Sequence, residues 1–228
     1  MIDTAVGDSV APANGPGASA ARPSLSPDLL DGTAATATLL SSLLLEPPSA
    51  EVLERLAASA DLPWPFPASD GSRPLGARLL CAPTDVAEAA DDHLRLFGGA
   101  LPALASPHES VYRSDEHLLF GEVTIEVRAA YARYGVAAPA GGRPADDHIG
   151  LELAFVAHLA LAALDAIEAG DEAAAEQISD DLRAFCADHL LTWVRPFAQH
   201  VVREASTDLY RGVGHLLVDE ADRWTALT

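Results

Sequence analysis

The feature that most constrains the fold is an apolar segment in the second half of the chain. From Leu151 to Ile167 it reads LELAFVAHLALAALDAI. The segment is apolar around most of a helical circumference, which is typical of a helix at the centre of a helical bundle. Ala and Leu also dominate the other periodic segments, which are about 12 to 25 residues long, and strand-forming residues are sparse. The sequence therefore predicts an all-α fold built as one helical bundle.

The start of this segment carries the densest cluster of ionisable residues in the chain. Asp147 is predicted to cap the helix, because its carboxylate would lie at the positive end of the helix dipole. His148 would then open the helix. A wheel of about 100° per residue gathers four side chains on one stripe. That stripe comprises His148, Glu152, Phe155 and Leu159. The side chains of Glu152 and His148 are thus predicted to lie in apolar surroundings.

This cluster has a structural interpretation and a metal-binding one. In the first, Asp147 only caps, His148 is a core or boundary histidine, and Glu152 pairs with an arginine. In the second, His148 and Glu152 are two metal ligands spaced i, i+4. A metal site in a bundle needs further ligands at helical spacing, and the chain contains neither Glu-x-x-His nor His-Glu-x-x-His.

Composition restricts the partners. The 228 residues, 49% of them hydrophobic, suffice for the core of one domain. The formal net charge of −20 argues against nucleic acid or an anionic membrane surface as a partner, since both need clustered cations. Basic partners are the natural complement.

Cysteine use and the N-terminal sequence indicate a cytoplasmic protein. Cys81 and Cys186 lie far apart in apolar contexts, so we expect buried free thiols and a reducing compartment. Residues 1–21 contain no Lys or Arg and include two Asp, unlike a secretory signal peptide. No uninterrupted run of about 18 apolar residues occurs, so we expect no spanning helix and no stable membrane insertion.

Local signals divide the chain into a tail and one domain. Residues 1–25 are predicted to be a flexible tail, and residues 26–228 an all-helical domain. Predicted helices run from 27 to before Pro47, from 50 to about 61, from 84 to 97, from about 116 to 134, from 148 to about 167, from about 171 to Pro196, and from 197 to about 224 with an optional break near Ser206. Ser26 and Ser49 are predicted caps. The linker 137–143 is a candidate hinge.

The segment DLPWPFPASDGSRP, residues 61–74, cannot form a regular helix or a central strand, because each proline removes a donor and restrains its predecessor. Its aromatic residues, Trp64 and Phe66, could anchor the loop on the core. Alternatively, they could form an apolar platform for a ligand.

The segment Ser106 to Glu109 also has two interpretations. It could be a capping box with Pro107 at the first helical position. The alternative is a loop that holds Glu109, Ser110 and Tyr112 at a binding surface.

Three separated blocks resemble the TorD/DmsD family of cytoplasmic chaperones. They are LRLFGGALPALASPHESVYRSDEHLLFGEVTIEVRAAYARYGV (94–136), DDHIGLELAFVAHLA (146–160) and HLLTWVRPFAQHV (189–201), with Tyr210 where a later aromatic is expected. They resemble the family's Pro-x-Glu-Ser-Val-Tyr, Asp-His-(Ile/Leu)-x-x-Glu-Leu and His-Leu-x-x-Trp-x-x-x-Phe patterns, in the same order. The chain departs from the family at Pro144 and Ala145, where an acid is common, and in an N-terminal helix without aromatics.

The resemblance implies a non-enzymatic chaperone that binds the twin-arginine signal peptide of a molybdenum-containing oxidoreductase. Such a protein holds its partner back from export until the cofactor is inserted. We predict no cofactor for the chain itself. A receptor for two arginines followed by an apolar stretch should combine carboxylates with an apolar groove. The protein is expected to be a monomer, or a dimer that exchanges helices.

The predicted peptide-binding residues follow from the resemblance and from this chemistry. They are Asp147, His148, Glu152, Glu109, Ser110, Tyr112, Leu96, Phe97, Phe155 and Trp64. The acids would pair with arginine, the apolar residues would form a wall, and His148 would orient Asp147 or donate to a peptide carbonyl. No metal-binding residue is predicted.

Two other functions remain open at this point. The first is a small helical hydrolase or metal-dependent enzyme that uses His148, Glu152 and Glu109. Against it stand the missing metal motifs, phosphate loop and Gly-x-Ser-x-Gly elbow. The second is a bundle that only oligomerises.

Overall fold

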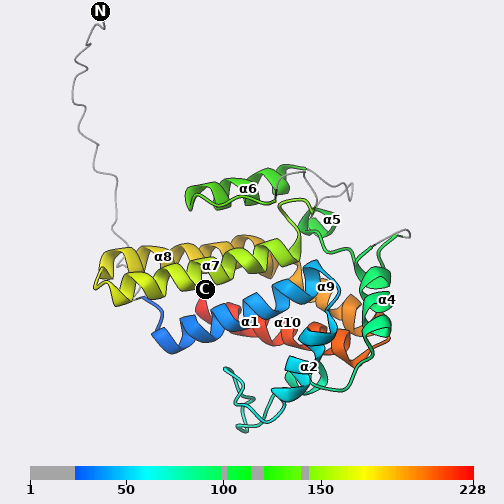
Figure 1. The fold of residues 1–228 in the computed structure, drawn as a ribbon. Helices are drawn as coiled ribbons and strands as arrows, with labels where there is room; N and C mark the ends of the chain where they lie inside the picture. The colour runs from blue at the N-terminus through cyan, green and yellow to red at the C-terminus, as the bar shows by residue number, and fades with distance from the viewer. Residues whose placement is uncertain (1–23, 99–101, 114–120, 140–143) are drawn as a thin grey trace, which may run out of the picture.

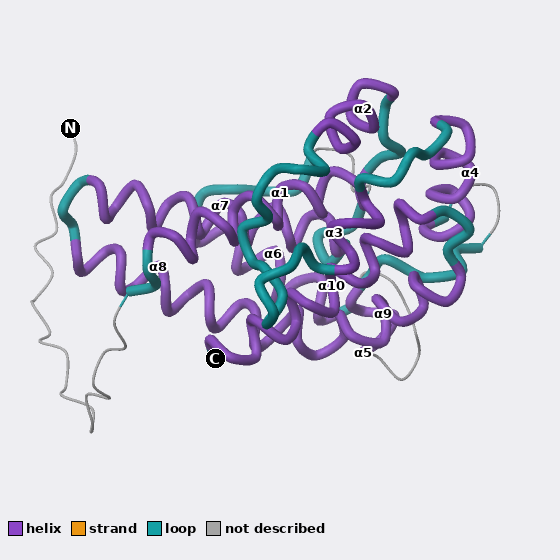
Figure 2. The backbone as a smooth tube through the Cα atoms, turned by 90° about the horizontal axis from the view of Figure 1, so that it is seen from below, coloured by secondary structure: helices purple, strands orange, loops and turns teal. Residues whose placement is uncertain are grey.

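Helices account for nearly all regular structure in the computed structural model, which describes residues 24–98, 102–113, 121–139 and 144–228 (Figures 1 and 2). The elements are α1 (Pro27–Leu45), α2 (Ala50–Ala58), α3 (Leu75–Leu80), α4 (Val86–Phe97), α5 (Glu109–Arg113), α6 (Glu122–Arg133), α7 (Ile149–Glu168), α8 (Glu172–Phe185), the π-helical turn η1 (Cys186–Leu190), α9 (Leu191–Glu204) and α10 (Asp208–Leu227). No strand occurs within these ranges, and the predicted all-α fold is confirmed. The predicted tail lies outside the described residues up to residue 23.

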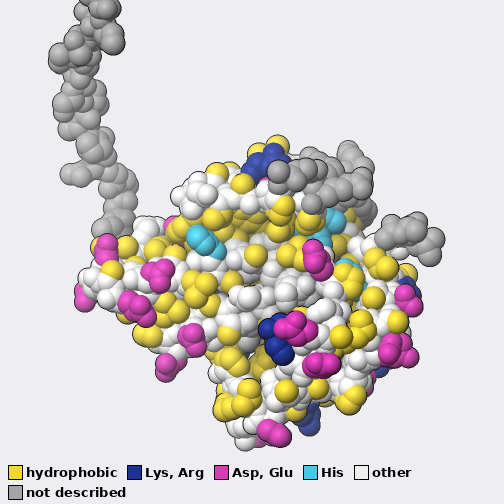
Figure 3. All heavy atoms as spheres, in the orientation of Figure 1, with side chains coloured by type: hydrophobic (Ala, Val, Ile, Leu, Met, Phe, Trp, Pro, Cys, Tyr) yellow, Lys and Arg dark blue, Asp and Glu magenta, His cyan; other side chains and the backbone are white. Residues whose placement is uncertain are grey.

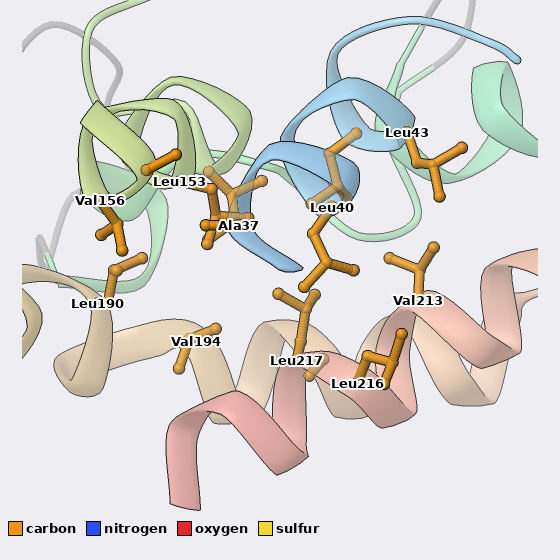
Figure 4. Packing of buried hydrophobic residues seen from close by; sticks show 14 of the residues in the cluster. Ala37, Leu40, Leu43, Leu153, Val156, Leu190, Val194, Val213, Leu216 and Leu217 are labelled. Atoms are coloured by element: carbon orange, nitrogen blue, oxygen red, sulfur yellow. The ribbon is translucent and has the colours of Figure 1, made fainter. Parts of the chain in front are cut away.

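Helix α1 begins and ends where the sequence predicted. Ser26 caps it by accepting a hydrogen bond from the amide of Leu29, and Pro27 occupies the first turn. Its buried face packs on α7. Figure 4 shows side chains of α1, α7, η1, α9 and α10 converging on one core. The labelled side chains are Ala37, Leu40, Leu43, Leu153, Val156, Leu190, Val194, Val213, Leu216 and Leu217.

Helix α7 lies at the centre of this core, as predicted. Within the described ranges, α7 is also the one helix that is long and apolar enough to cross a membrane. The expectation of no spanning helix missed it, because that expectation required an uninterrupted run of apolar residues. More than half of its most apolar window is buried inside the bundle. In this protein the apolar surface of α7 packs inside the bundle.

The prediction that Pro196 ends a helix is wrong. The chain continues from α8 through η1 into α9, and Pro196 lies inside α9. The prediction relied on the hydrogen bond that a proline cannot donate. Pro196 is exposed, so water can reach the carbonyl that the proline leaves unpaired, while the nearby Trp193 and Phe197 are fully buried and keep the helix in place. The optional break near Ser206 is confirmed, with Thr207 capping α10.

Helix α3, which packs closely on α10, was not predicted from the sequence. A Cβ atom on Gly76 would lie 2.7 Å from the carbonyl oxygen of Gly212, and one on Gly212 would lie 2.8 Å from that of Gly76. The two helices can approach this closely because neither residue carries a side chain.

We expect Gly212→Ala to lower the free energy of unfolding by about 1–3 kcal/mol, since the new methyl group meets backbone atoms that cannot move independently. Urea denaturation measures the loss. Gly121→Ala is the control, because its new methyl group would meet no atom of the described residues within 4 Å apart from its chain neighbours. An unchanged unfolding midpoint for Gly212→Ala would contradict the close approach.

Candidate functional site

The residue that caps α7 is His148, and the prediction that Asp147 caps it is wrong. Nδ1 of His148 accepts a hydrogen bond of 3.1 Å from the amide of Gly150. Burial, together with the neighbouring His108, lowers the pKa of His148 to about 3, so its imidazole is neutral. The neutral ring can accept the amide proton, which leaves the Asp147 carboxylate free for other partners.

Asp147 instead joins three elements. Its fully buried carboxylate accepts hydrogen bonds of 3.0 Å from the amide of Ser110 in α5 and from the hydroxyl of Thr124 in α6. Its backbone carbonyl accepts a third, also of 3.0 Å, from the amide of Glu109. Asp147 therefore holds α5 and α6 against the start of α7.

The preceding residue, Asp146, binds α6 as well. Its Oδ2 accepts hydrogen bonds from Nε and Nη2 of Arg128, at 3.1 and 2.7 Å. Its backbone carbonyl accepts one of 2.9 Å from the hydroxyl of Tyr131. The contacts of both aspartates with α6 come from one face of that helix.

Glu109 lies at the first position of α5 and is fully buried. Its carboxylate contacts Nη1 of Arg113 at 2.6 Å and Nδ1 of His189 at 3.0 Å, and accepts a longer hydrogen bond from Thr192. The capping-box interpretation is therefore wrong, because that motif needs this side chain to reach back to Ser106 three residues earlier.

Of these buried acids, Glu152 has the fewest hydrogen bonds. It is fully buried, and Oε2 accepts one hydrogen bond of 3.4 Å from the indole of Trp193, while Oε1 accepts none from the described residues. Burial raises the pKa of Glu152 well above its ordinary value, and the neighbouring charges of Glu109 and Asp147 raise it further.

An apolar pocket of about 180 Å³ lies beside these acids. It is lined by Tyr131, Val136, Ala137, Ala138, Leu151, Ala154, Phe155 and His158. Figure 3 shows hydrophobic side chains gathered between α6 and α7 on this face of the molecule. Tyr131 connects the two regions, because its ring packs 4.8 Å from that of Phe155 while its hydroxyl binds Asp146.

The structure brings most of the predicted site residues together. Glu109, Ser110, Asp147, His148 and Glu152 form the buried group, which we call the acidic cluster together with Asp146. Phe155 lines the adjacent pocket.

Tyr112 lies next to the acidic cluster, with its ring 5.2 Å from that of Trp193, which binds Glu152. Burial raises the pKa of Tyr112 to about 12. The hydroxyl of Ser110 is buried and has no partner within the described residues.

Three predicted residues lie elsewhere. Leu96 is fully buried in the core, and Phe97 packs among core aromatics, with its ring 5.5 Å from that of Tyr210. Trp64 is half-buried in the loop after α2, under the guanidinium of Arg73. In Figure 1 this loop and α6 lie on opposite sides of the bundle. A role for these residues in peptide binding stays a prediction.

The partners that α6 contributes were not predicted from the sequence. Thr124, Arg128 and Tyr131 are spaced i, i+4, i+7, so they share one face of a helix. That pattern was readable in the sequence. It mixes a hydroxyl, a cation and an aromatic ring, however, and so does not produce the apolar periodicity by which helix faces are recognised.

The structure places the three residues of the enzyme alternative in the acidic cluster, but it engages their side chains in separate contacts. His148 uses Nδ1 as a helix cap, whereas Glu109 pairs with Arg113 and His189. In the part of the chain that the structure describes, no group of three or more His, Cys, Asp or Glu side chains could hold a metal ion.

These features define a class of protein: a helical bundle with an acidic cluster at the start of its central helix and an apolar pocket beside it. A family model described as nitrate reductase delta subunit matches residues 67–199, more than half of the chain. The chain therefore belongs to this family, and its resemblance to the TorD/DmsD proteins is confirmed.

Curated relatives agree with this assignment. The chaperone protein TorD of Vibrio cholerae is 31% identical over 129 residues, which cover 57% of each chain. A DmsD of Haemophilus influenzae, named as a probable Tat proofreading chaperone, is 26% identical over 129 residues, 57% of this chain and 56% of its own. The chain thus matches little more than half the length of these relatives.

A solved structure also resembles the chain. It is described as a redox enzyme maturation protein from Archaeoglobus fulgidus, with a TM-score of 0.49 and 15% identity. The match covers 86% of this chain and 93% of that one.

The raised pKa of Glu152 predicts a pH dependence of stability. Between its unfolded value near 4.5 and its higher folded value, the folded protein binds more protons than the unfolded chain. The free energy of unfolding should therefore fall as the pH rises through this window, by at most about 1.4 kcal/mol per pH unit for one proton.

Glu152→Gln should remove this component, because an amide does not titrate. Urea denaturation at a series of pH values from 4.5 upward gives the difference between wild type and variant. Asp165→Asn, an exposed change in the same helix, should keep the wild-type profile. Parallel profiles for wild type and Glu152→Gln would show that Glu152 is ionised in the folded protein.

Proposed function

We propose that this protein is a cytoplasmic chaperone for a molybdenum-containing oxidoreductase and that it binds the twin-arginine signal peptide of that partner. It would hold the partner until its cofactor is inserted, without chemistry of its own. The observation that carries the proposal is the acidic cluster beside an apolar pocket, in a chain that belongs to a family with TorD and DmsD among its curated relatives.

The acidic cluster has the composition that a receptor for arginine needs. It contains the carboxyl groups of Glu109, Asp146, Asp147 and Glu152. The guanidinium groups of Arg113 and Arg128 pair with Glu109 and Asp146, and His189 also contacts Glu109. An incoming guanidinium offers several donors in a planar fork, which suits carboxylates that are partly satisfied. Oε1 of Glu152 is an available acceptor once it is deprotonated.

The apolar pocket suits the segment that follows the arginines in a signal peptide. At about 180 Å³ it has room for an apolar side chain and is smaller than typical ligand pockets of about 300–1,000 Å³. Helix-in-groove recognition uses apolar anchors of this kind. The net charge of −20 would also accelerate the encounter with a cationic segment.

Access to the acidic cluster requires a change of conformation. The side chains of Glu109, Asp147 and Glu152 have no solvent exposure in this structure. Because α5 and α6 supply the contacts that cover Asp147, these are the elements that would have to move.

Calorimetry with a synthetic twin-arginine signal peptide tests the proposal. We expect binding to the wild-type protein and a loss of at least about tenfold in affinity when both peptide arginines are alanine, because buried charge pairs are worth about 2–5 kcal/mol when one partner is removed. The combined change Asp146→Asn and Asp147→Asn should cause a similar loss.

Asp165→Asn, which alters an exposed carboxylate at the far end of α7, is the matched control and should bind like wild type. Circular dichroism verifies that each variant keeps its helicity. Equal affinity for the arginine and alanine peptides would refute the proposal.

A further inference from the structure

Helix α6 contacts the acidic cluster as a bound peptide could. Its inner face presents Thr124, Arg128 and Tyr131 to the two consecutive aspartates before α7. The three side chains lie at i, i+4 and i+7, and all three donate hydrogen bonds to Asp146 or Asp147. These aspartates are polar anchor points for α6 on the central helix.

These contacts have the chemistry that the proposed signal peptide would offer. Arg128 places two guanidinium nitrogens on Oδ2 of Asp146, as a peptide arginine could. Three residues further along, the ring of Tyr131 packs against Phe155 at the edge of the apolar pocket. A cation followed by an apolar group is the pattern that a twin-arginine signal peptide offers.

Much of α6 is not buried by other elements. Ile125 on its outer face is 62% exposed, and Glu122, Glu126, Ala129 and Arg133 are also exposed. The pocket between its C-terminal end and α7 shows that the two helices are not tightly packed there. In Figure 1, α6 lies apart from the bundle formed by α1, α7, α8 and α10.

The ion pair that anchors α6 is also displaceable. The side chain of Arg128 is 61% exposed, whereas that of Asp146 is 9% exposed. Because the guanidinium of Arg128 reaches solvent, water screens its attraction to Asp146 and weakens the ion pair. A peptide arginine that makes the same contact with Asp146, shielded from water, can therefore replace Arg128.

We propose that α6 is an internal competitor for the signal-peptide site. In the free protein Arg128 occupies Asp146, and a peptide arginine takes this place when α6 leaves the aspartates. This inference rests on the proposed function and adds its regulation: the apparent affinity for the peptide is reduced by the fraction of molecules in which α6 is docked. Contacts that hold α6 therefore weaken peptide binding.

The first test is Arg128→Ala, measured by calorimetry with the same twin-arginine peptide. Removing this solvent-screened contact should raise the affinity about 1.5- to 5-fold. Arg133→Ala is the matched control, because it removes the same charge from an exposed position of the same helix without touching the aspartates. The affinity of Arg133→Ala for the peptide should change less than that of Arg128→Ala, because Arg133 does not contact the aspartates.

The second test fixes α6 in place. The hydroxyl of Tyr134 at the C-terminal end of α6 lies 2.7 Å from Oδ2 of Asp181 in α8. Cysteines replacing these two residues can be joined by a short bis-maleimide that contains a reducible disulfide. The native thiols of Cys81 and Cys186 are buried, and each single-cysteine variant treated with the same reagent serves as a control.

We expect the cross-linked protein to lose peptide binding and to regain it when the linker is reduced. Undiminished binding by the cross-linked protein, or an Arg128→Ala affinity no higher than that of Arg133→Ala, would overturn the inference while leaving the proposed function intact. Failure of the wild-type protein to bind the peptide would instead remove the proposed function itself. The exposed Arg128→Ala variant keeps the inference testable even if the double-cysteine variant does not fold.

Discussion

The burial of several carboxyl groups at the start of α7 is the constraint on which the rest of the structure depends. An unpaired carboxylate in an apolar interior is costly, so each acid must find donors or take up a proton. Asp147 takes its donors from α5 and α6, and Glu109 takes Arg113 and His189. Glu152 is left with one long hydrogen bond and a raised pKa. These needs position α5 and α6 against the start of the central helix.

The fold was largely predictable because its signals are local. Ser26 with Pro27 and the apolar periodicity of α1 and α7 are properties of short windows, and the structure confirms them. Pro196 was misread because buried neighbours hold α9 together across a residue that usually ends a helix. The short α3 was missed because it depends on the close approach of Gly76 and Gly212, which are distant in sequence.

The acidic cluster was only partly predictable. The sequence placed Glu152 and Asp147 at the start of the central helix, and it singled out Glu109 as a candidate for a binding surface. It could not show that His148 would be the cap, since that choice depends on a neutral imidazole that burial produces. Nor could it show that Arg128, 18 residues before Asp146, would lie on that carboxylate.

Three fully buried acids, one of them with a single long hydrogen bond, contribute little to stability, and the proposed function would give them a role as acceptors for a peptide arginine. The central claim is that Glu152 is protonated in the free protein and gives up its proton to a cationic guest. Carbon-13 NMR titration of the glutamate side-chain carboxyls, assigned with Glu152→Gln, measures this directly. We expect a pKa above the usual glutamate range without peptide and a lower one when the twin-arginine peptide is bound. An ordinary pKa in the free protein, or one unchanged by the peptide, would contradict the claim.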